Sequence, residues 1–441
     1  MYPTADRAAR DPITPGMLSG AFRAAEGVAR CMTIFHGPQG CQENLYAEAC
    51  FVHEQPEYPE PAAGEPFLPS TVLTDSDLIM GPEDKLARAA TGVARQYRPD
   101  LIIAFSSDAA EIIGEDAQNL MRQTGEGGGG AGGGGGAARE PHRLWVDTAS
   151  FKGSWVDGYA AVLAALTALM TETPVRPLTV NLLGVAGDEL GARADIAELR
   201  RMLRRVGAEV NAVLLCHTPL AAIRGAPAAS LNVVVAEELG LPVAQAMERR
   251  FKAPYLVATP PYGLAGAARF LDEVAAALGL EENARRVNEQ ETGAMGAKIR
   301  SYSGFITVPM RASVCGEPSF VAGFAGLLSE LGVYVPVVAL RTPPGPSAAR
   351  VVEDFTGNAA CVALVAPEHA DYLDALRECG GVDYIFGSAM EQFVAADVGA
   401  TLVECTYPAV RVLDWDEPTL GFCGAAAMAR RLGRAFFKQV M

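Results

Sequence analysis

Residues 31–41, CMTIFHGPQGC, join an apolar run with β-branched residues to a tight turn of glycine and proline. The run predicts a buried strand, and the turn predicts an exposed loop at its carboxyl end. Two similar runs follow, LIIAF at 101–105 and RLWVD at 143–147, and helical patterns at 83–97 and 111–122 lie between them. Apolar strands that alternate with amphipathic helices are typical of a parallel sheet covered on both faces.

The same alternation occurs twice more along the chain. One set of strand-like runs extends from 179 to 260, and another from 310 to 405. Three such sets predict an α/β protein with three doubly wound, parallel-sheet domains. We place these domains at 1–175, 176–305 and 306–441, and the last domain ends in a helix.

Two segments fall outside this alternation. Residues 54–77 are rich in proline and acidic residues, which predicts a long irregular excursion. Residues 125–136 contain ten glycines in twelve positions. No Lys-Ser or Lys-Thr pair follows these glycines, and they do not connect a strand to a helix, so the segment is not a phosphate-binding loop. We expect a flexible surface insertion there and no nucleotide bound by this chain.

Composition excludes several classes of protein. Of the 441 residues, 50% are hydrophobic, which predicts a globular protein with buried cores rather than a disordered chain. The net charge of −16 disfavours binding to nucleic acid or to anionic membranes. The amino terminus lacks the apolar core of a signal peptide, and the longest apolar stretch, at 159–170, is too short to span a bilayer. Nine widely spread cysteines predict reduced thiols and a cytoplasmic location.

Cys41 is the first candidate for chemistry. Its loop lies at the carboxyl edge of the predicted sheet, where open α/β domains bind ligands, and backbone N–H groups there can stabilise a thiolate or bridging sulfides. The alternative is a surface cysteine in a turn. A zinc site is a weaker hypothesis because zinc usually needs two close ligand pairs. Cys31, His36, Cys50 and His53 lie close together in the sequence, but only Cys50 and His53 have the spacing of a ligand pair. Cys31 and Cys50 also lie in apolar elements, where cysteine behaves as a small hydrophobic residue.

A second candidate segment is SSDAAEIIGED at 106–116, directly after the LIIAF strand. Its first residues are expected at the same edge as Cys41, where Ser107 or Asp108 can face a ligand. The favoured alternative is structural. Asp108 followed by Glu111 fits the capping box of a helix amino terminus.

With HGPQGC at 36–41 and AEIIGED at 110–116, the chain resembles the component 1 proteins of nitrogenase and their relatives. These relatives include the cofactor scaffold complex and the light-independent reductases of the chlorophyll pathway. The resemblance continues through PSTVLTDSDLIMGPEDKL at 69–86 and SLNVVVAEELGLPVAQAMERRFKAP at 230–254 to EPTLGFCGAAAMARRL at 417–432. It implies three Rossmann-like domains, in agreement with the three sets of strands and helices.

The resemblance also implies a cluster site. Members with a full ligand set bind an interface iron–sulfur cluster through three cysteines, whose positions fall here at Gly16, Cys41 and Asp108. One remaining thiolate implies a [4Fe–4S] cluster that takes three cysteines from a paralogous partner. In this interpretation Cys41 is the metal ligand, with Gly40 and His36 beside it. Asp108 is either a further carboxylate ligand or a helix cap.

The resemblance finally suggests the role of the chain. The position at which a cysteine holds the active-site metallocluster of nitrogenase is Ala236 here, so the chain resembles a β-type subunit. The implied function is that of a nitrogenase-like, two-component oxidoreductase. An α-type partner completes the complex as an α2β2 heterotetramer, and a separate ATP-dependent iron–sulfur reductase supplies the electrons. The alternatives are an assembly scaffold for nitrogenase-type cofactor maturation and a zinc or metal-free α/β protein in which HGPQGC is only a turn.

Overall fold

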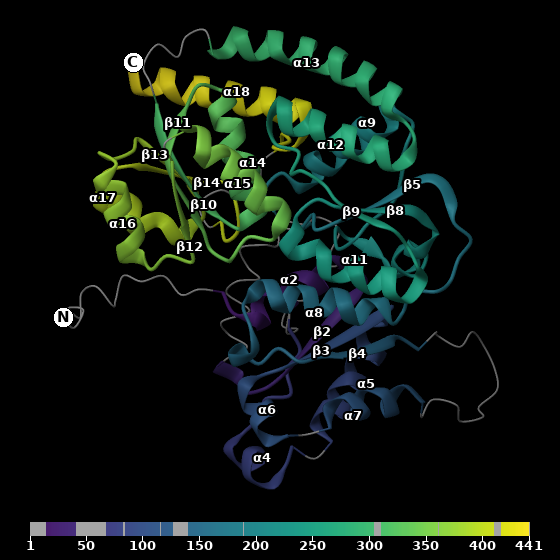
Figure 1. Ribbon diagram of the computed structural model, residues 1–441. Coiled ribbons are helices and arrows are strands. Elements are labelled where there is room, and N and C mark those ends of the chain that lie inside the picture. The colour runs from purple at the N-terminus through teal and green to yellow at the C-terminus, as the bar shows by residue number, and fades with distance from the viewer. Residues whose placement is uncertain are drawn as a thin grey trace. The chain divides into compact units, whose positions relative to one another are not determined.

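A computed structural model describes the protein at residues 15–40, 68–82, 84–114, 116–126, 140–187, 189–303, 310–359, 361–409 and 416–440. Within these ranges the strands form three parallel sheets and one two-stranded pair, with helices between them (Figure 1). The predicted α/β class with parallel, helix-covered sheets is therefore confirmed. No helix in the described ranges combines the length and the hydropathy that a membrane span requires.

The chain packs into two compact units. The amino-terminal unit consists of Pro15–Thr173 and Leu214–Pro227, and it contains the first sheet. The carboxyl-terminal unit contains the second and third sheets, in Pro174–Val213 and Ala228–Met441. The three-domain boundaries near residues 175 and 305 stay a prediction.

The first sheet has the order β2-β3-β4, with all strands parallel. Its helices lie on both faces, with α2 and α8 on one side and α5 and α7 on the other (Figure 1). On the second of these faces, Ile34 and Ile102 pack against Leu86 and Met121 in one apolar cluster. The elements are β2 (Cys31–His36), β3 (Leu101–Ser106), β4 (His142–Val146), α2 (Met17–Glu26), α5 (Lys85–Tyr97), α7 (Ala117–Glu126) and α8 (Trp155–Thr167).

The helix predicted at 111–122 is two helices in the structure. Helix α6 (Asp108–Ile113) ends at Gly114, whose φ of +71° lies in the left-handed region that glycine adopts without strain. Helix α7 then begins at Ala117. The prediction of one continuous helix was therefore wrong, because the helix breaks at Gly114.

Helices α2 and α8 cross with their backbones in contact. A Cβ atom built on Gly20 would lie 1.7 Å from the carbonyl oxygen of Trp155. A Cβ atom built on Gly158 would lie 1.8 Å from the carbonyl oxygen of Met17. Only glycine fits at these two positions, because any side chain would overlap the backbone of the other helix.

The second sheet has the order β6-β5-β8-β9. A ladder of side-chain amides crosses it, since Asn211 donates to the buried Asn181 at 2.9 Å and Asn181 donates to the buried Asn232 at 2.8 Å. Its strands are β5 (Arg176–Leu183), β6 (Glu209–Val213), β8 (Ala229–Val234) and β9 (Tyr255–Val257). Its helices are α9 (Ala192–Val206), α11 (Glu237–Phe251), α12 (Gly263–Leu278) and α13 (Glu281–Ser303).

The third sheet has the order β12-β11-β10-β13-β14, so successive connections run outward from the central strand β10 in both directions. This order is that of a doubly wound sheet with a switch point between β10 and β13. Its strands are β10 (Arg311–Gly316), β11 (Tyr334–Leu340), β12 (Val362–Val365), β13 (Tyr384–Gly387) and β14 (Thr401–Glu404). The helices are α14 (Pro318–Glu330), α15 (Pro346–Ala359), α16 (His369–Glu378), α17 (Gln392–Val398) and α18 (Gly421–Val440).

Acidic side chains join the second and third sheets into one unit. Glu237 of α11 accepts a hydrogen bond from the backbone N–H of Ser347, 2.9 Å away in the first turn of α15. In the other direction, Glu330 of α14 accepts from the N–H groups of Leu264 and Ala265 in the first turn of α12. Each carboxylate satisfies helix N–H groups that have no partner within their own helix.

Residues 214–227 leave the second sheet and complete the amino-terminal unit. Strand β7 (Thr218–Pro219) pairs in parallel with β1 (Val28–Ala29), and the short helix α10 (Leu220–Arg224) follows. At Gly27 a Cβ atom would lie 2.4 Å from the carbonyl oxygen of Leu215. The amino-terminal unit is therefore built from two separate stretches of sequence.

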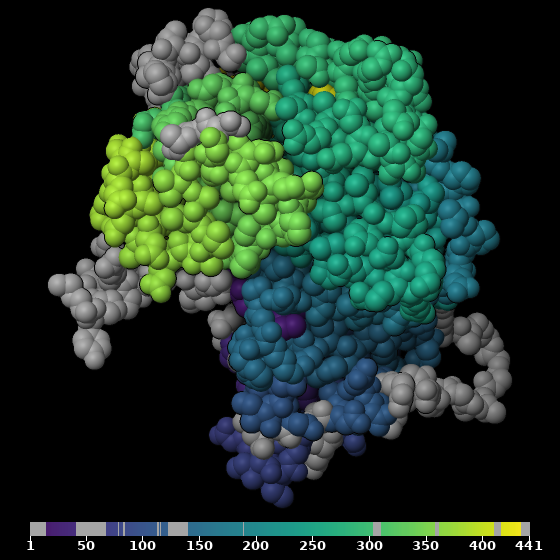
Figure 2. All heavy atoms as spheres, viewed as in Figure 1, coloured from purple at the N-terminus to yellow at the C-terminus, as the bar shows by residue number. Residues whose placement is uncertain are grey.

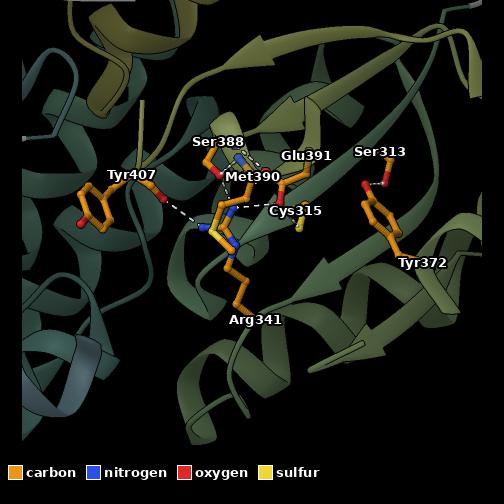
Figure 3. Close-up of polar contacts among 8 residues, drawn as sticks. All are labelled: Ser313, Cys315, Arg341, Tyr372, Ser388, Met390, Glu391 and Tyr407. Atoms are coloured by element: carbon orange, nitrogen blue, oxygen red, sulfur yellow. Dashed lines mark hydrogen bonds and ion pairs between the residues drawn. The ribbon is translucent and has the colours of Figure 1, made fainter. Parts of the chain in front are cut away.

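A buried ion pair ties together four strand ends of the third sheet (Figure 3). Arg341, just after β11, donates to both carboxylate oxygens of Glu391 at 2.9 Å, to the Ser388 hydroxyl and to the Tyr407 carbonyl. The Cys315 thiol at the end of β10 donates to Glu391 at 3.3 Å. Glu391 lies in a short 3-10 helix (Ala389–Glu391), and its side chain lies at the switch point between β10 and β13.

We expect Glu391→Gln to lower the free energy of unfolding by about 3 kcal/mol, because the buried Arg341 guanidinium loses its counter-charge. Unfolding in guanidinium chloride, followed by circular dichroism, measures the change. Glu353→Gln is the matched control, since Glu353 is an exposed residue of α15, and it should change the value by less than about 0.5 kcal/mol. Overlapping curves for Glu391→Gln and wild type would show that the ion pair adds nothing to stability.

Candidate functional site

The carboxyl edge of the first sheet gathers the predicted candidate segments. His36 at the end of β2 is in register with Ser106 at the end of β3, and Asp147 directly follows β4. The loop that leads from His36 toward Cys41 and the segment that begins at Ser106 therefore lie at one edge. This placement is the one predicted from the alternating pattern.

His36 is completely buried. Its Nδ1 lies 3.0 Å from the hydroxyl of Thr71, and its ring meets the Trp145 ring edge to face with centroids 6.0 Å apart. Thr71 in turn donates its backbone N–H to the carbonyl of Phe35, so residues 69–71 run alongside β2. His36, from inside the fold, thus holds residues 69–71 in place beside β2.

The loop after β2 is packed closely against the loop after β3. A Cβ atom on Gly37 would lie 2.5 Å from Cβ of Ser107, and the Ser107 N–H donates to the His36 carbonyl at 3.0 Å. Gly40 is the last described residue of this loop, and no atom of the described residues lies within 4 Å of a Cβ atom built on it. Cys41 lies outside the described residues, as do Cys50, His53 and most of the glycine-rich segment 125–136.

The two candidate zinc ligands in the described ranges do not lie close to each other. Cys31 and His36 stand at opposite ends of β2, about 16 Å apart at the usual rise of a strand. Burial raises the pKa of the Cys31 thiol, as expected for a core cysteine. In the described ranges no group of three or more His, Cys, Asp and Glu side chains is arranged to hold a metal ion.

Asp108 is not the cap of its helix. Ser107 is the N-cap residue of α6, and its hydroxyl accepts the Ala110 N–H at 3.1 Å. Asp108 is the first residue of the helix, and its carboxylate accepts two hydrogen bonds from Ser150, one from the backbone N–H at 2.5 Å and one from the hydroxyl at 2.6 Å. The predicted cap was therefore one residue too late, because Ser107 and Asp108 are both good capping residues.

Gly16 lies at the same edge as Asp108. It is the N-cap residue of α2, pairs with Ser154 in an isolated bridge and has an extended backbone. Among the described residues, the nearest atom to a Cβ built on Gly16 is Cβ of Ser150, 4.0 Å away, so these residues leave room for a side chain there. Two positions that are 92 residues apart in sequence thus meet at Ser150.

Sequence reasoning missed both Ser150 and Lys152. They are the two ends of a short 3-10 helix, η1 (Ser150–Lys152), after β4. The Lys152 ammonium binds the carboxylates of Glu111 and Asp147. Hydrogen bonds with Asp147 and Glu111 raise the pKa of Lys152, while Asp147 has a lowered pKa because the bond from Lys152, with smaller ones, outweighs the opposing effect of burial.

A pocket of about 280 Å³ opens beside these groups. Glu111, Asp147 and Trp145 line it, together with His36. The hydroxyl of Ser106 donates to Asp147 at 3.1 Å and accepts the Thr148 N–H at 2.8 Å, which fixes the wall at the end of β4. The edge therefore combines an ordered set of polar side chains with an accessible cavity.

Comparison with known proteins gives a consistent result. The family model "Nitrogenase component 1 type Oxidoreductase" matches residues 17–436. The chain is 23% identical to the nitrogenase molybdenum-iron protein beta chain of Methanococcus maripaludis, over 94% of this chain and 91% of that protein. It is 27% identical to a subunit of the light-independent protochlorophyllide reductase of Chloroflexus aurantiacus, over 93% of this chain and 73% of that one. The solved structure "Nitrogenase Cp1 at pH 6.5" has the same fold, with a TM-score of 0.80 at 18% identity over 98% of this chain and 93% of that one.

Proposed function

The chain belongs to the nitrogenase component 1 type oxidoreductase family, and from this premise we propose that it is the β-type subunit of a two-component reductase. Both of these relatives are named as one part of a larger enzyme, the first as a beta chain and the second as a reductase subunit. In this proposal Cys41 binds a [4Fe–4S] cluster that is completed by three cysteines of a paralogous α-type partner. The partner and this chain form an α2β2 complex.

The meeting of Gly16 and Asp108 at Ser150 is the observation that supports the cluster site. These are the two positions at which the family resemblance places the other ligands, and the described loop leads from the same edge toward Cys41. The room that the described residues leave at Gly16 fits a position from which a ligand side chain is missing. A site with one thiolate on this chain needs the remaining ligands from a partner.

Each side chain at the edge has a distinct task in this proposal. A bound [4Fe–4S] cluster would accept and pass on single electrons at low potential. The Cys41 thiolate would hold one iron, and the Gly37–Ser107 contact keeps its loop against the sheet. Ser150 keeps the Asp108 carboxylate in one orientation, either as a further ligand or as a fixed negative charge at the rim. His36 anchors the loop from the core.

The electrons would come from a separate ATP-dependent iron–sulfur reductase. We propose the cytoplasm as the compartment, because low-potential clusters and free thiols need a reducing environment. In the described ranges the seven cysteines form no disulfide with one another.

Iron analysis of the complete complex tests the proposal. We expect co-expression with the α-type partner and anaerobic purification to give about four iron atoms per heterodimer. Dithionite should reduce them to a species with an electron paramagnetic resonance (EPR) signal. No iron, or stoichiometric zinc, would refute the cluster at Cys41. The assembly-scaffold alternative predicts instead that the complex gives up its metal cluster to an acceptor protein and turns over no substrate.

Exposed apolar side chains beside the site offer a further test. Ile79 and Met80 at the end of α4 (Asp75–Met80) are 80% and 82% exposed, and Ile112 of α6 is 79% exposed. Helices α4 and α6 contact each other, and the region that holds them forms an outer surface of its unit (Figure 2). We propose that these exposed apolar side chains belong to a contact surface for the separate reductase.

We expect Ile112→Asp to raise the reductase concentration needed for half-maximal cluster reduction about tenfold, because a charge replaces an apolar contact. Stopped-flow reduction measures this dependence. Val175→Asp changes a side chain that is 61% exposed in the other unit, and it should leave the dependence unchanged. If Ile112→Asp instead abolished co-purification with the α-type partner, the surface would be the subunit interface.

A further inference from the structure

Lys152 joins two carboxylates at the edge of the first sheet. Its ammonium is 2.5 Å from Oε1 of Glu111 on α6, and it also binds Oδ2 of Asp147 after β4. The three side chains are each about one third exposed, and they form a network of three charges rather than a single ion pair. None of the motifs in the sequence identified this cluster.

The same short helix holds α6 at two points. Ser150 at one end of η1 binds Asp108, and Lys152 at the other end binds Glu111. Asp108 and Glu111 are three residues apart on α6, so they lie on the same face of that helix. Lys152 therefore helps to fix the segment that orients Asp108 at the proposed cluster site.

Lys152 also sets the local charge. With Glu111 and Asp147 ionised, the ion cluster carries one net negative charge when Lys152 is present and two when it is removed. Its hydrogen bonds to Asp147 and Glu111 raise the pKa of Lys152, so the ammonium stays charged at neutral pH. One-electron reduction, by the iron–sulfur reductase or by dithionite, adds a negative charge at this edge, and a nearby positive charge favours it.

We propose that Lys152 is a positioning residue that raises the reduction potential of the cluster at this edge by offsetting the charges of Glu111 and Asp147. The inference rests on the proposed function, since it assumes that Cys41 holds an iron–sulfur cluster. It goes further by assigning to this chain a residue that tunes electron transfer without binding the metal.

Two variants that break the same ion pair separate the electrostatic effect from a structural one. Lys152→Met removes a positive charge, and Glu111→Gln removes a negative one. The proposal predicts a shift to more negative potential for Lys152→Met and to more positive potential for Glu111→Gln. Lys152→Arg keeps the charge and should keep the wild-type potential.

The experiment is an EPR-monitored redox titration of the anaerobic complex with its α-type partner, with iron content measured on each sample. Shifts of the same sign in Lys152→Met and Glu111→Gln would overturn the proposal. A loosened structure alone would not make the direction of the potential shift depend on the sign of the charge that was removed. If Lys152→Met lost its cluster, Glu111→Gln would still decide the sign. A wild-type complex without iron would overturn the proposed function and this inference together. A full cluster whose potential is the same in all four proteins would overturn the inference alone.

Discussion

Replacing Cys41 by alanine should abolish the four-iron EPR signal of the complex and reduce its iron to about three atoms per heterodimer or fewer. The physical reason is that Cys41 is the proposed thiolate of this chain. Without it one iron has no protein ligand and is lost. Iron analysis and EPR of the anaerobic complex measure the effect, and the predicted loss of cluster reduction by the reductase follows from it.

A second cysteine provides the control for this experiment. Cys379 follows α16 on the third sheet and donates its thiol to the carbonyl of Leu376 at 3.1 Å. Cys379→Ala should keep the wild-type iron content and signal. Unchanged iron in Cys41→Ala would mean that HGPQGC is a turn without a ligand, and the remaining conclusion would be the fold and the family.

Gly158→Ala should lower the free energy of unfolding by about 4 kcal/mol or more, since backbone overlap is the extreme form of overpacking. The added methyl carbon would lie 1.8 Å from the carbonyl oxygen of Met17, and no side-chain rotation can relieve that contact. Helices α2 and α8 would have to move apart. Unfolding in guanidinium chloride, followed by tryptophan fluorescence, to which the buried Trp155 beside this crossing contributes, measures the loss.

Gly92→Ala is the matched control. Gly92 is an exposed residue inside α5, and no atom of the described residues lies within 4 Å of a Cβ atom built on it. Alanine is a better helix former there, so the variant should be as stable as the wild type or up to about 1 kcal/mol more stable. Similar stability of Gly158→Ala and Gly92→Ala would contradict the close crossing of the two helices.

The strands were the most predictable part of this fold. The run CMTIFH coincides with β2, and LIIAF lacks only the final Ser106 of β3. Both strands are buried on both faces, so nearly every position is apolar and the signal does not depend on a period. The common edge of the first sheet followed from the parallel order, which places the carboxyl ends of its strands together.

The supporting side chains of the site could not be predicted in the same way. Ser150 and Lys152 lie in a single turn with no periodic pattern, and their partners Asp108 and Glu111 are about 40 residues away in the sequence. The contacts exist only because β3 and β4 are neighbours. Cys41 itself was found from its motif alone, and it lies outside the described residues.

The packing of residues 214–227 into the amino-terminal unit could not be predicted from the sequence either. Strands β1 and β7 have two residues each, and such short pairs carry no hydrophobic period. The glycine at 27 is needed only because Leu215 approaches it from a distant part of the chain. The pairing depends on tertiary proximity, which a local pattern does not encode.

This packing has a consequence for biosynthesis. A ribosome that has released residues 15–173 has not yet made Leu214–Pro227, which belongs to the same compact unit. Residues 174–213 must emerge first, and they belong to the other unit. The nascent amino-terminal unit therefore stays incomplete until these forty residues and the segment after them have emerged, because β1 has no β7 to pair with before then. A gene truncated after Thr173 would produce a fragment that lacks Leu214–Pro227 and therefore never completes the amino-terminal unit.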